Sequence, residues 1–111
     1  MRPHPLAALA VLLITGALTP PALAQGQNAA REALYARSLA ASCANCHGTD
    51  GRAVQGSTVP ALAGLDKAYV VAQMNAFKTG ARSATVMHQI SKGFSDAQVD
   101  ALAGYFAAQK K

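Results

Sequence analysis

The chain has 111 residues, a formal net charge of +5 and 51% hydrophobic residues. This length allows one domain. Because the sequence has no dense Lys/Arg run and no aromatic RNA-binding motif, we expect no nucleic-acid partner. A domain this small buries only about 60% of the surface that its unfolded chain exposes, so it usually relies on a covalent link or a bound group for stability.

The first 24 residues have the pattern of a secretory signal peptide. A basic residue precedes an apolar run over residues 6–18, and Ala22-Leu23-Ala24 supplies the small residues that a signal peptidase reads. We expect cleavage after residue 24, export to the periplasm and one mature domain over residues 25–111. The run of about 13 residues is shorter than the ~20 of a membrane-spanning helix, so the mature protein should have no membrane span. A retained N-terminal anchor is the alternative.

A helix is predicted over residues 29–41, which are rich in Ala, Leu, Arg and Glu. Asn28 is its expected N-cap, and the polar residues 25–28 before it are expected to be frayed. This helix leads the chain directly to Cys43.

The stretch Cys43-Ala44-Asn45-Cys46-His47 contains both cysteines of the chain. The C-x-x-C-H spacing lets each thiol bond covalently to one haem vinyl group, while the histidine that follows ligates the iron. We therefore predict one covalently attached haem c per chain, with Cys43 and Cys46 as attachment points and His47 as the proximal ligand.

Two other uses of these cysteines are disfavoured by the sequence. A disulfide between residues three apart would close only a short loop and restrain little chain entropy. A zinc site would need two more ligands, and beyond His47 only His88 remains outside the predicted signal peptide.

Residues 48–64 contain four glycines and little periodicity, so they are predicted to be a loop that packs around the edge of the haem. A carbonyl near Pro60 could accept the Nδ1 proton of His47, which would fix the ring and raise its basicity. The alternative is an ordinary loop proline.

A second helix is predicted over residues 67–79, with Asp66 as N-cap and Gly80 as the stop. Its apolar side chains at i, i+4 and i+7 should point inward: Val70, Met74 and Phe77. Met74 is therefore expected to be a core residue rather than an iron ligand.

Met87 follows His47 by 40 residues, far enough for the chain to reach the opposite haem face. We predict it as the distal ligand. Ligation by His and Met favours electron transfer over oxygen chemistry, because no open iron site is left. In a short helical turn over 87–92, His88 would point about 100° away from Met87, toward solvent or a partner. The alternatives are a core role for Met87 with five-coordinate iron, and His88 as the ligand.

The last helix is predicted to begin after Ser95, which forms a capping box with Gln98. Its apolar stripe comprises Val99, Leu102, Ala103 and Phe106. The N-terminal helix, with its alanines and Leu39, is the expected packing partner. Gly104 is expected to permit a close crossing of the two helices.

From residue 38 to residue 106 the order of these features resembles a class I cytochrome c. The phrases at residues 42–51, 59–64, 73–82, 84–87 and 92–96 resemble the small cytochrome subunit of flavocytochrome c sulfide dehydrogenase and its bacterial relatives. The resemblance implies an all-α fold of three main helices plus loops around one covalent haem. It also implies thioether bonds at Cys43 and Cys46, His47 as proximal ligand and Met87 as distal ligand.

The same resemblance implies an electron-transfer protein that is not an enzyme by itself. The first hypothesis is a haem subunit that accepts electrons from a flavoprotein sulfide dehydrogenase. The second is a free soluble periplasmic carrier between respiratory complexes, whose docking rim would attract acidic partners through Lys67, Lys78, Arg82 and Lys92. The third is a haem catalyst or sensor with an open iron.

Overall fold

The computed structural model describes residues 21–111, and within this range the protein is all-helical, without strands. The elements in chain order are α1 (Pro21–Ala41), α2 (Ala44–His47), the 3-10 turn η1 (Thr49–Gly51), α3 (Lys67–Thr79), α4 (Met87–Ile90), the 3-10 turn η2 (Ser91–Gly93) and α5 (Asp96–Ala107). The prediction of an all-α fold with three main helices is confirmed. The predicted signal peptide, residues 1–24, lies outside the described residues except for 21–24, which begin α1.

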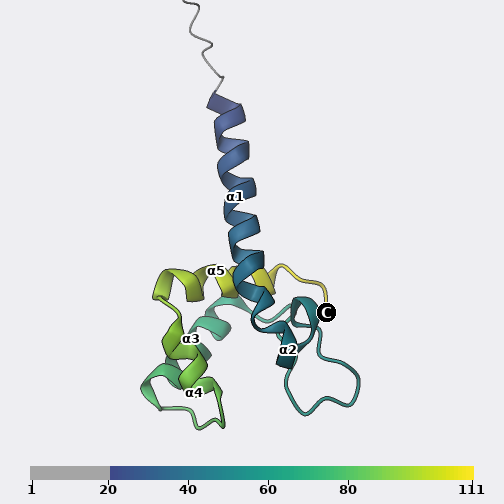
Figure 1. Ribbon diagram of the computed structural model, residues 1–111, viewed down its shortest axis with the longest axis vertical. Helices are drawn as coiled ribbons and strands as arrows, with labels where there is room; N and C mark the ends of the chain where they lie inside the picture. Colours follow the sequence, from purple (N-terminus) through teal and green to yellow (C-terminus); the bar gives the residue numbers. More distant parts are fainter. Residues whose placement is uncertain (1–20) are drawn as a thin grey trace, which may run out of the picture.

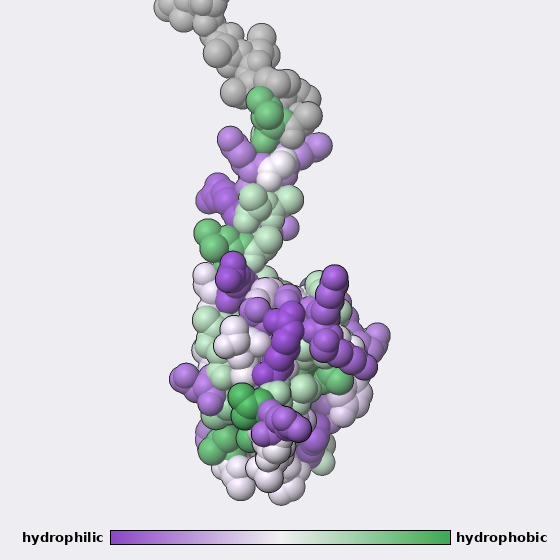
Figure 2. Space-filling model, turned by 90° about the vertical axis from the view of Figure 1, so that its right-hand side faces the viewer, coloured by the Kyte–Doolittle hydropathy of each residue, from purple (hydrophilic) through white to green (hydrophobic). Residues whose placement is uncertain are grey.

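The N-terminal helix begins earlier than the sequence predicts. α1 starts at Pro21, so Asn28 lies inside the helix and is not its N-cap. Proline is compatible with a first helical turn, where its missing N–H would be unpaired anyway, and the Ala, Leu and Gln residues that follow are good helix formers. Residues 23–35 are exposed. Figure 1 shows this part of α1 projecting from the rest of the molecule, and Figure 2 shows hydrophilic and apolar side chains mixed along it.

The C-terminal helix has the cap and the buried stripe that the sequence predicts. Oγ of Ser95 accepts the N–H of Gln98 at 3.2 Å, and Oε1 of Gln98 accepts the N–H of Ser95 at 2.9 Å, which completes the capping box. All four stripe residues are at most 3% exposed: Val99, Leu102, Ala103 and Phe106. The core formed by α5 includes Ala40, with Leu39 beside it, so the predicted pairing of α1 with α5 is confirmed.

Gly104 does not have the role that the sequence suggests. A Cβ added there would meet only Cε of Lys67, at 3.9 Å, which is an ordinary contact with α3. The expectation that Gly104 permits a close crossing of α1 is therefore wrong, because alanine would fit at this position.

The middle helix has the predicted bounds. Oδ1 of Asp66 caps α3 by accepting the N–H of Tyr69 at 2.9 Å, and Gly80 ends the helix with φ +79°. α3 also packs against α5, which the sequence does not predict. Two ion pairs join these helices, Lys67 with Asp100 at 2.8 Å and Lys78 with Asp96 at 3.0 Å.

α5 connects two groups of elements. α1 contacts α2 and η1, whereas α3 contacts α4 and η2, and α5 packs against both α1 and α3. Figure 1 shows α2 and α4 on opposite sides of the lower half of the molecule, with α5 above them. The C-terminal helix therefore holds the part of the chain that carries His47 in a defined position relative to the part that carries Met87.

Asp50, in the turn after α2, is tied to α5. Its Oδ1 accepts a hydrogen bond from the Tyr105 hydroxyl at 2.5 Å, and its Oδ2 lies 3.2 Å from Nη1 of Arg52. The Tyr105 hydrogen bond lowers the pKa of Asp50; burial opposes this shift, and Arg52 adds to it. The same hydrogen bond raises the pKa of Tyr105. Asp50 is therefore a carboxylate and Tyr105 a neutral phenol at neutral pH.

Replacing Ser95 tests the cap of α5. Ser95→Ala removes the acceptor for the Gln98 N–H, and we expect the free energy of unfolding to fall by about 1 kcal/mol. Ser83→Ala, at an exposed position between α3 and α4, is the matched control. Denaturant unfolding of both variants measures the difference, and equal stabilities would contradict a capping role.

Stability is expected to depend on pH through Asp50. Because its pKa is lowered in the folded protein, the carboxylate stabilises the fold above the unfolded value of about 3.9. This contribution is lost as the pH falls through the lower folded pKa. We expect Asp50→Asn to be less stable than wild type at neutral pH, and the difference to shrink in acid. Urea unfolding of both proteins from neutral to acid pH measures this difference in stability. A difference that stays constant over the whole pH range would contradict the interpretation.

Candidate haem site

His47 is buried, with 8% of its surface exposed, and its ring is held from one side. Nδ1 lies 2.7 Å from the carbonyl oxygen of Pro60, close to the place where the sequence suggested an acceptor. Because a carbonyl can only accept, Nδ1 carries the proton of the neutral ring, and Nε2 keeps its lone pair. The geometry therefore leaves Nε2 as the atom of His47 that can bind a metal.

The turn that follows His47 depends on a glycine. Gly48 has φ +82°, and a Cβ there would lie 1.9 Å from the carbonyl oxygen of Arg52. No other residue fits this approach, because a side chain would collide with backbone rather than with a flexible group. Gly48 lets the chain fold back at once beside the histidine.

Both cysteines are free thiols on the same short segment as His47. Cys43 precedes α2, and its carbonyl accepts the N–H of His47 at 2.9 Å. Burial raises the pKa of the Cys43 thiol, and a hydrogen bond with Ser42 partly offsets this. Since the thiolate is the reactive species, the buried Cys43 thiol is slow to react at neutral pH.

Met87 lies on a different part of the fold. It is the first residue of α4, is half-buried, and is carried by the group formed by α3, α4 and η2. His88 is also only partly exposed, and its Nδ1 is buried without a hydrogen-bond partner among the described residues. His88 was predicted to point toward solvent or a partner; its buried Nδ1 shows that the side chain is not turned fully to solvent, and contact with a partner stays a prediction.

The structure places Cys43, Cys46 and His47 on one short segment, brings the Pro60 carbonyl of the following loop to Nδ1 of His47, and leaves Met87 on another part of the fold. No group of three or more His, Cys, Asp and Glu side chains within residues 21–111 is placed to hold a metal ion. A zinc site is therefore not found in the described part of the chain.

These residues fit a covalently attached haem. Two thiols, one imidazole nitrogen and one thioether are the donor set of a c-type haem with two axial ligands. The protein's own core is small, since three of its seven buried apolar side chains in the described range are alanines. Val86 and Ile90, on either side of Met87, are 53% and 43% exposed. An apolar macrocycle is the kind of surface that covers such side chains.

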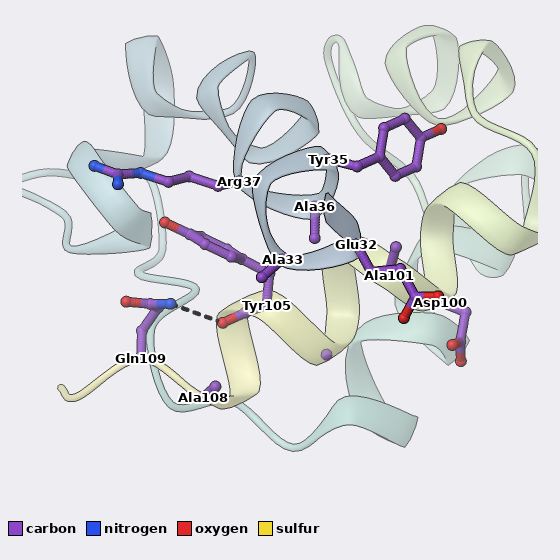
Figure 3. A pocket seen from close by; sticks show the side chains of 11 residues that line it. Glu32, Ala33, Tyr35, Ala36, Arg37, Asp100, Ala101, Tyr105, Ala108 and Gln109 are labelled. Atoms are coloured by element: carbon purple, nitrogen blue, oxygen red, sulfur yellow. Dashed lines mark hydrogen bonds between the residues drawn. The ribbon is translucent and has the colours of Figure 1, made fainter. Parts of the chain in front are cut away.

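A separate groove lies between α1 and α5, and Figure 3 shows it from close by. Its volume is about 610 Å³, and alanines of both helices line much of it, together with Tyr35, Arg37 and Tyr105. None of the predicted haem-site residues lines this groove. It belongs to the helix crossing and not to the candidate site.

The predicted basic rim is partly neutralised. Lys67 and Lys78 form the ion pairs with α5 described above, and the side chain of Lys78 is only 19% exposed. The guanidinium of Arg82 stacks on Phe77, 4.8 Å from the ring centre. Of the four predicted rim residues, Lys92 alone has no such partner within residues 21–111. Two of the four cations in the docking rim of the free-carrier hypothesis are therefore paired with α5, whereas Arg82 and Lys92 have no acidic partner among residues 21–111.

A search of residues 21–111 for membrane spans finds no helix with both the length and the apolar character needed to cross a bilayer.

The chain resembles several known cytochromes over much of its length. It is 35% identical over 108 residues to "Thiosulfate dehydrogenase electron acceptor" of Stutzerimonas stutzeri, covering 94% of this chain and 46% of that protein. It is 37% identical over 73 residues to "Cytochrome subunit of sulfide dehydrogenase" of Chlorobaculum tepidum, covering 66% of this chain and 64% of that protein. It is 38% identical over 102 residues to "Cytochrome c4" of Pseudomonas aeruginosa, covering 92% of this chain and 48% of that protein.

The chain thus spans less than two thirds of the length of each of these relatives. The family model described as "Cytochrome c" matches residues 32–110, which include the C-x-x-C-H segment and all elements from α2 to α5. The chain therefore belongs to the cytochrome c family.

Proposed function

We propose that the chain is a periplasmic monohaem electron-transfer protein, bound to its cofactor through Cys43 and Cys46. His47 is the proximal ligand and Met87 the distal ligand. The observation that carries the proposal is the 2.7 Å contact between Nδ1 of the buried His47 and the Pro60 carbonyl. It leaves Nε2 of this ring as a preoriented donor next to two free thiols.

Each residue has a distinct role in this proposal. The bound haem supplies reversible uptake of one electron. The two thiols fix the position of the group, and the Pro60 carbonyl sets the orientation and basicity of the His47 ring. The Met87 thioether would be the second ligand of the iron, and ligation by His and Met would raise the reduction potential and leave no open site for small gases. The protein therefore passes electrons and does not bind a sulfur substrate itself.

The proposed electron donor is a flavoprotein that oxidises sulfide. The similarity to the sulfide dehydrogenase cytochrome subunit of Chlorobaculum tepidum supports this choice, since it covers about two thirds of both chains. The surface charge supports it as well. With Lys67 and Lys78 paired to Asp100 and Asp96 of the same chain, the predicted rim attracts acidic partners less strongly, as suits a subunit that stays bound rather than one that repeatedly searches for its partner.

A free periplasmic carrier is the second candidate. It is supported by the similarity to the thiosulfate dehydrogenase electron acceptor and to cytochrome c4, each of which extends over more than nine tenths of this chain. In either case, removal of residues 1–24 after export belongs to the proposal.

Replacing Met87 tests the distal ligand. In Met87→Ala the sulfur-to-iron charge-transfer absorption of the oxidised protein should disappear. The reduction potential should fall by on the order of 0.1 V or more, within the span of about 0.8 V that axial ligands set. Visible spectroscopy and redox titration measure both effects.

Met74→Ala is the matched control. Met74 is also half-buried and lies on α3, so its removal should cost stability but leave the spectrum unchanged. If Met87→Ala kept the wild-type spectrum, the iron would be five-coordinate or bound by another residue, and the catalyst or sensor hypothesis would take precedence.

Isolation of the protein from its native host under mild conditions separates the two electron-transfer hypotheses. A permanent subunit should elute with a flavin-containing chain in a constant ratio of flavin to haem, and the ratio should survive a wash at high salt. A haem protein that elutes alone, without flavin, would contradict the subunit proposal and support the free carrier.

A further inference from the structure

We propose that Asp50 and Tyr105 are a positioning pair that holds the Pro60 carbonyl against His47 and so tunes the electron affinity of the cofactor. This inference rests on the proposed ligand role of His47. It adds two residues far apart in the sequence to the site, one in the turn after α2 and one in the C-terminal helix.

Asp50 has an unusual backbone conformation. With φ +55° and ψ +25° it is the one non-glycine residue with positive φ in the described range. Such a conformation costs free energy for a residue with a side chain and persists only where the surroundings impose it. Here both carboxylate oxygens are occupied, Oδ1 by the Tyr105 hydroxyl and Oδ2 by Arg52. Arg52 in turn donates from Nε to the carbonyl of Lys110 at 3.1 Å. The turn is therefore fixed to the C-terminal segment at two points.

Gly51, the next residue, joins this turn to the loop that carries Pro60. Its carbonyl accepts the N–H of Leu62 at 2.8 Å and the N–H of Ala63 at 3.1 Å. Gly51 is buried, and a Cβ on it would come within 2.8 Å of Phe106 and 2.9 Å of the Ala63 nitrogen. The turn and the loop therefore cannot shift independently of each other.

Pro60 lies two residues before the first of these anchored N–H groups. Its own side chain is exposed, so its packing contributes little to the direction of its carbonyl. Its position depends mainly on the anchored residues that follow it, and through them on Gly51 and Asp50. Hydrogen bonds and the short backbone segments between them thus connect Tyr105 to Nδ1 of His47.

Tyr105 is itself well placed to act as the fixed end of this series. Its ring packs edge-on against Phe106, with centroids 5.4 Å apart and planes at 80°. Its backbone carbonyl accepts a hydrogen bond from Nε2 of Gln109 at 3.0 Å. Figure 3 shows the ring lying along the groove between α1 and α5, with its hydroxyl on the side where Arg37 lies. The hydroxyl therefore meets Asp50 from a rigid helix.

The chemical consequence concerns the donor strength of His47. A carbonyl that accepts the Nδ1 proton makes the imidazole a more basic ligand, which favours the oxidised iron. If the turn at Asp50 loosens, the contact at Pro60 weakens and His47 becomes a poorer donor. The cofactor should then be easier to reduce.

The test compares two tyrosines of the holoprotein. Tyr105→Phe removes the hydroxyl that binds Asp50 but keeps the ring. Tyr35→Phe is the matched control, because its hydroxyl also makes a hydrogen bond, accepting from Nε2 of Gln98 at 3.2 Å, but has no connection to Pro60. Redox titration and proton NMR of the Nδ1–H resonance of His47 are measured for both, beside denaturant unfolding.

We expect Tyr105→Phe to raise the ratio of reduced to oxidised haem severalfold at a fixed ambient potential and to move the His47 resonance. Tyr35→Phe should leave both unchanged. Asp50→Asn should shift the ratio in the same direction, and the double variant should shift it by less than the sum of the two. If Tyr105→Phe lowers stability without moving potential or resonance, the pair has only a structural role and the inference is overturned.

The remaining outcomes are also decisive. If Tyr105→Phe yields no holoprotein, Asp50→Asn is measured in its place, and failure of both to assemble would assign the pair to folding and overturn the inference. If the wild-type protein itself holds no covalent haem, or His47 does not ligate it, the proposed function fails. If ligation is intact and only the variant effect is absent, the inference fails alone.

Discussion

The hydrogen bond between Nδ1 of His47 and the Pro60 carbonyl is the interaction on which the proposed site depends. It selects one tautomer of a buried ring and leaves Nε2 as the only donor atom, beside two thiols on the same short segment. A haem attached at these thiols would find its proximal ligand already oriented, so little side-chain entropy would be lost when the iron is bound.

α5 is the element that makes this orientation useful for electron transfer. Its buried stripe packs on α1, and its acidic residues pair with Lys67 and Lys78 of α3. The elements that carry His47 and those that carry Met87 are therefore joined through one helix. Since a change of one electron requires little rearrangement in a stiff ligand set, a rigid connection between the two ligand-bearing parts suits a carrier better than a flexible one.

Local signals in the sequence predicted the elements with clear ends. Asp66 marks the start of α3 and Gly80 its end, and Ser95 caps α5. These signals could be read from the sequence because N-caps and C-terminal glycines act within a few residues. The start of α1 was missed, since residues 22–28 contain no strong stop signal. The Asp50–Tyr105 contact and the ion pairs of α3 with α5 join residues far apart in the chain and leave no local signature. For the site, the segment from Cys43 to His47 was found from its C-x-x-C-H spacing, and the acceptor near Pro60 from the proline in the loop that follows it. The ligand roles of His47 and Met87 stay predictions.

The measurement that tests the central claim most directly is proton NMR of the reduced protein with labelled methionine methyl groups. A methionine bound to haem iron lies against the porphyrin ring. The ring current of the porphyrin shifts the resonance of the methionine methyl group far outside its normal range. The account predicts one strongly shifted methyl signal that belongs to Met87, with Met74 in the normal range. A spectrum without a shifted methionine, or with the shift on Met74, would contradict it.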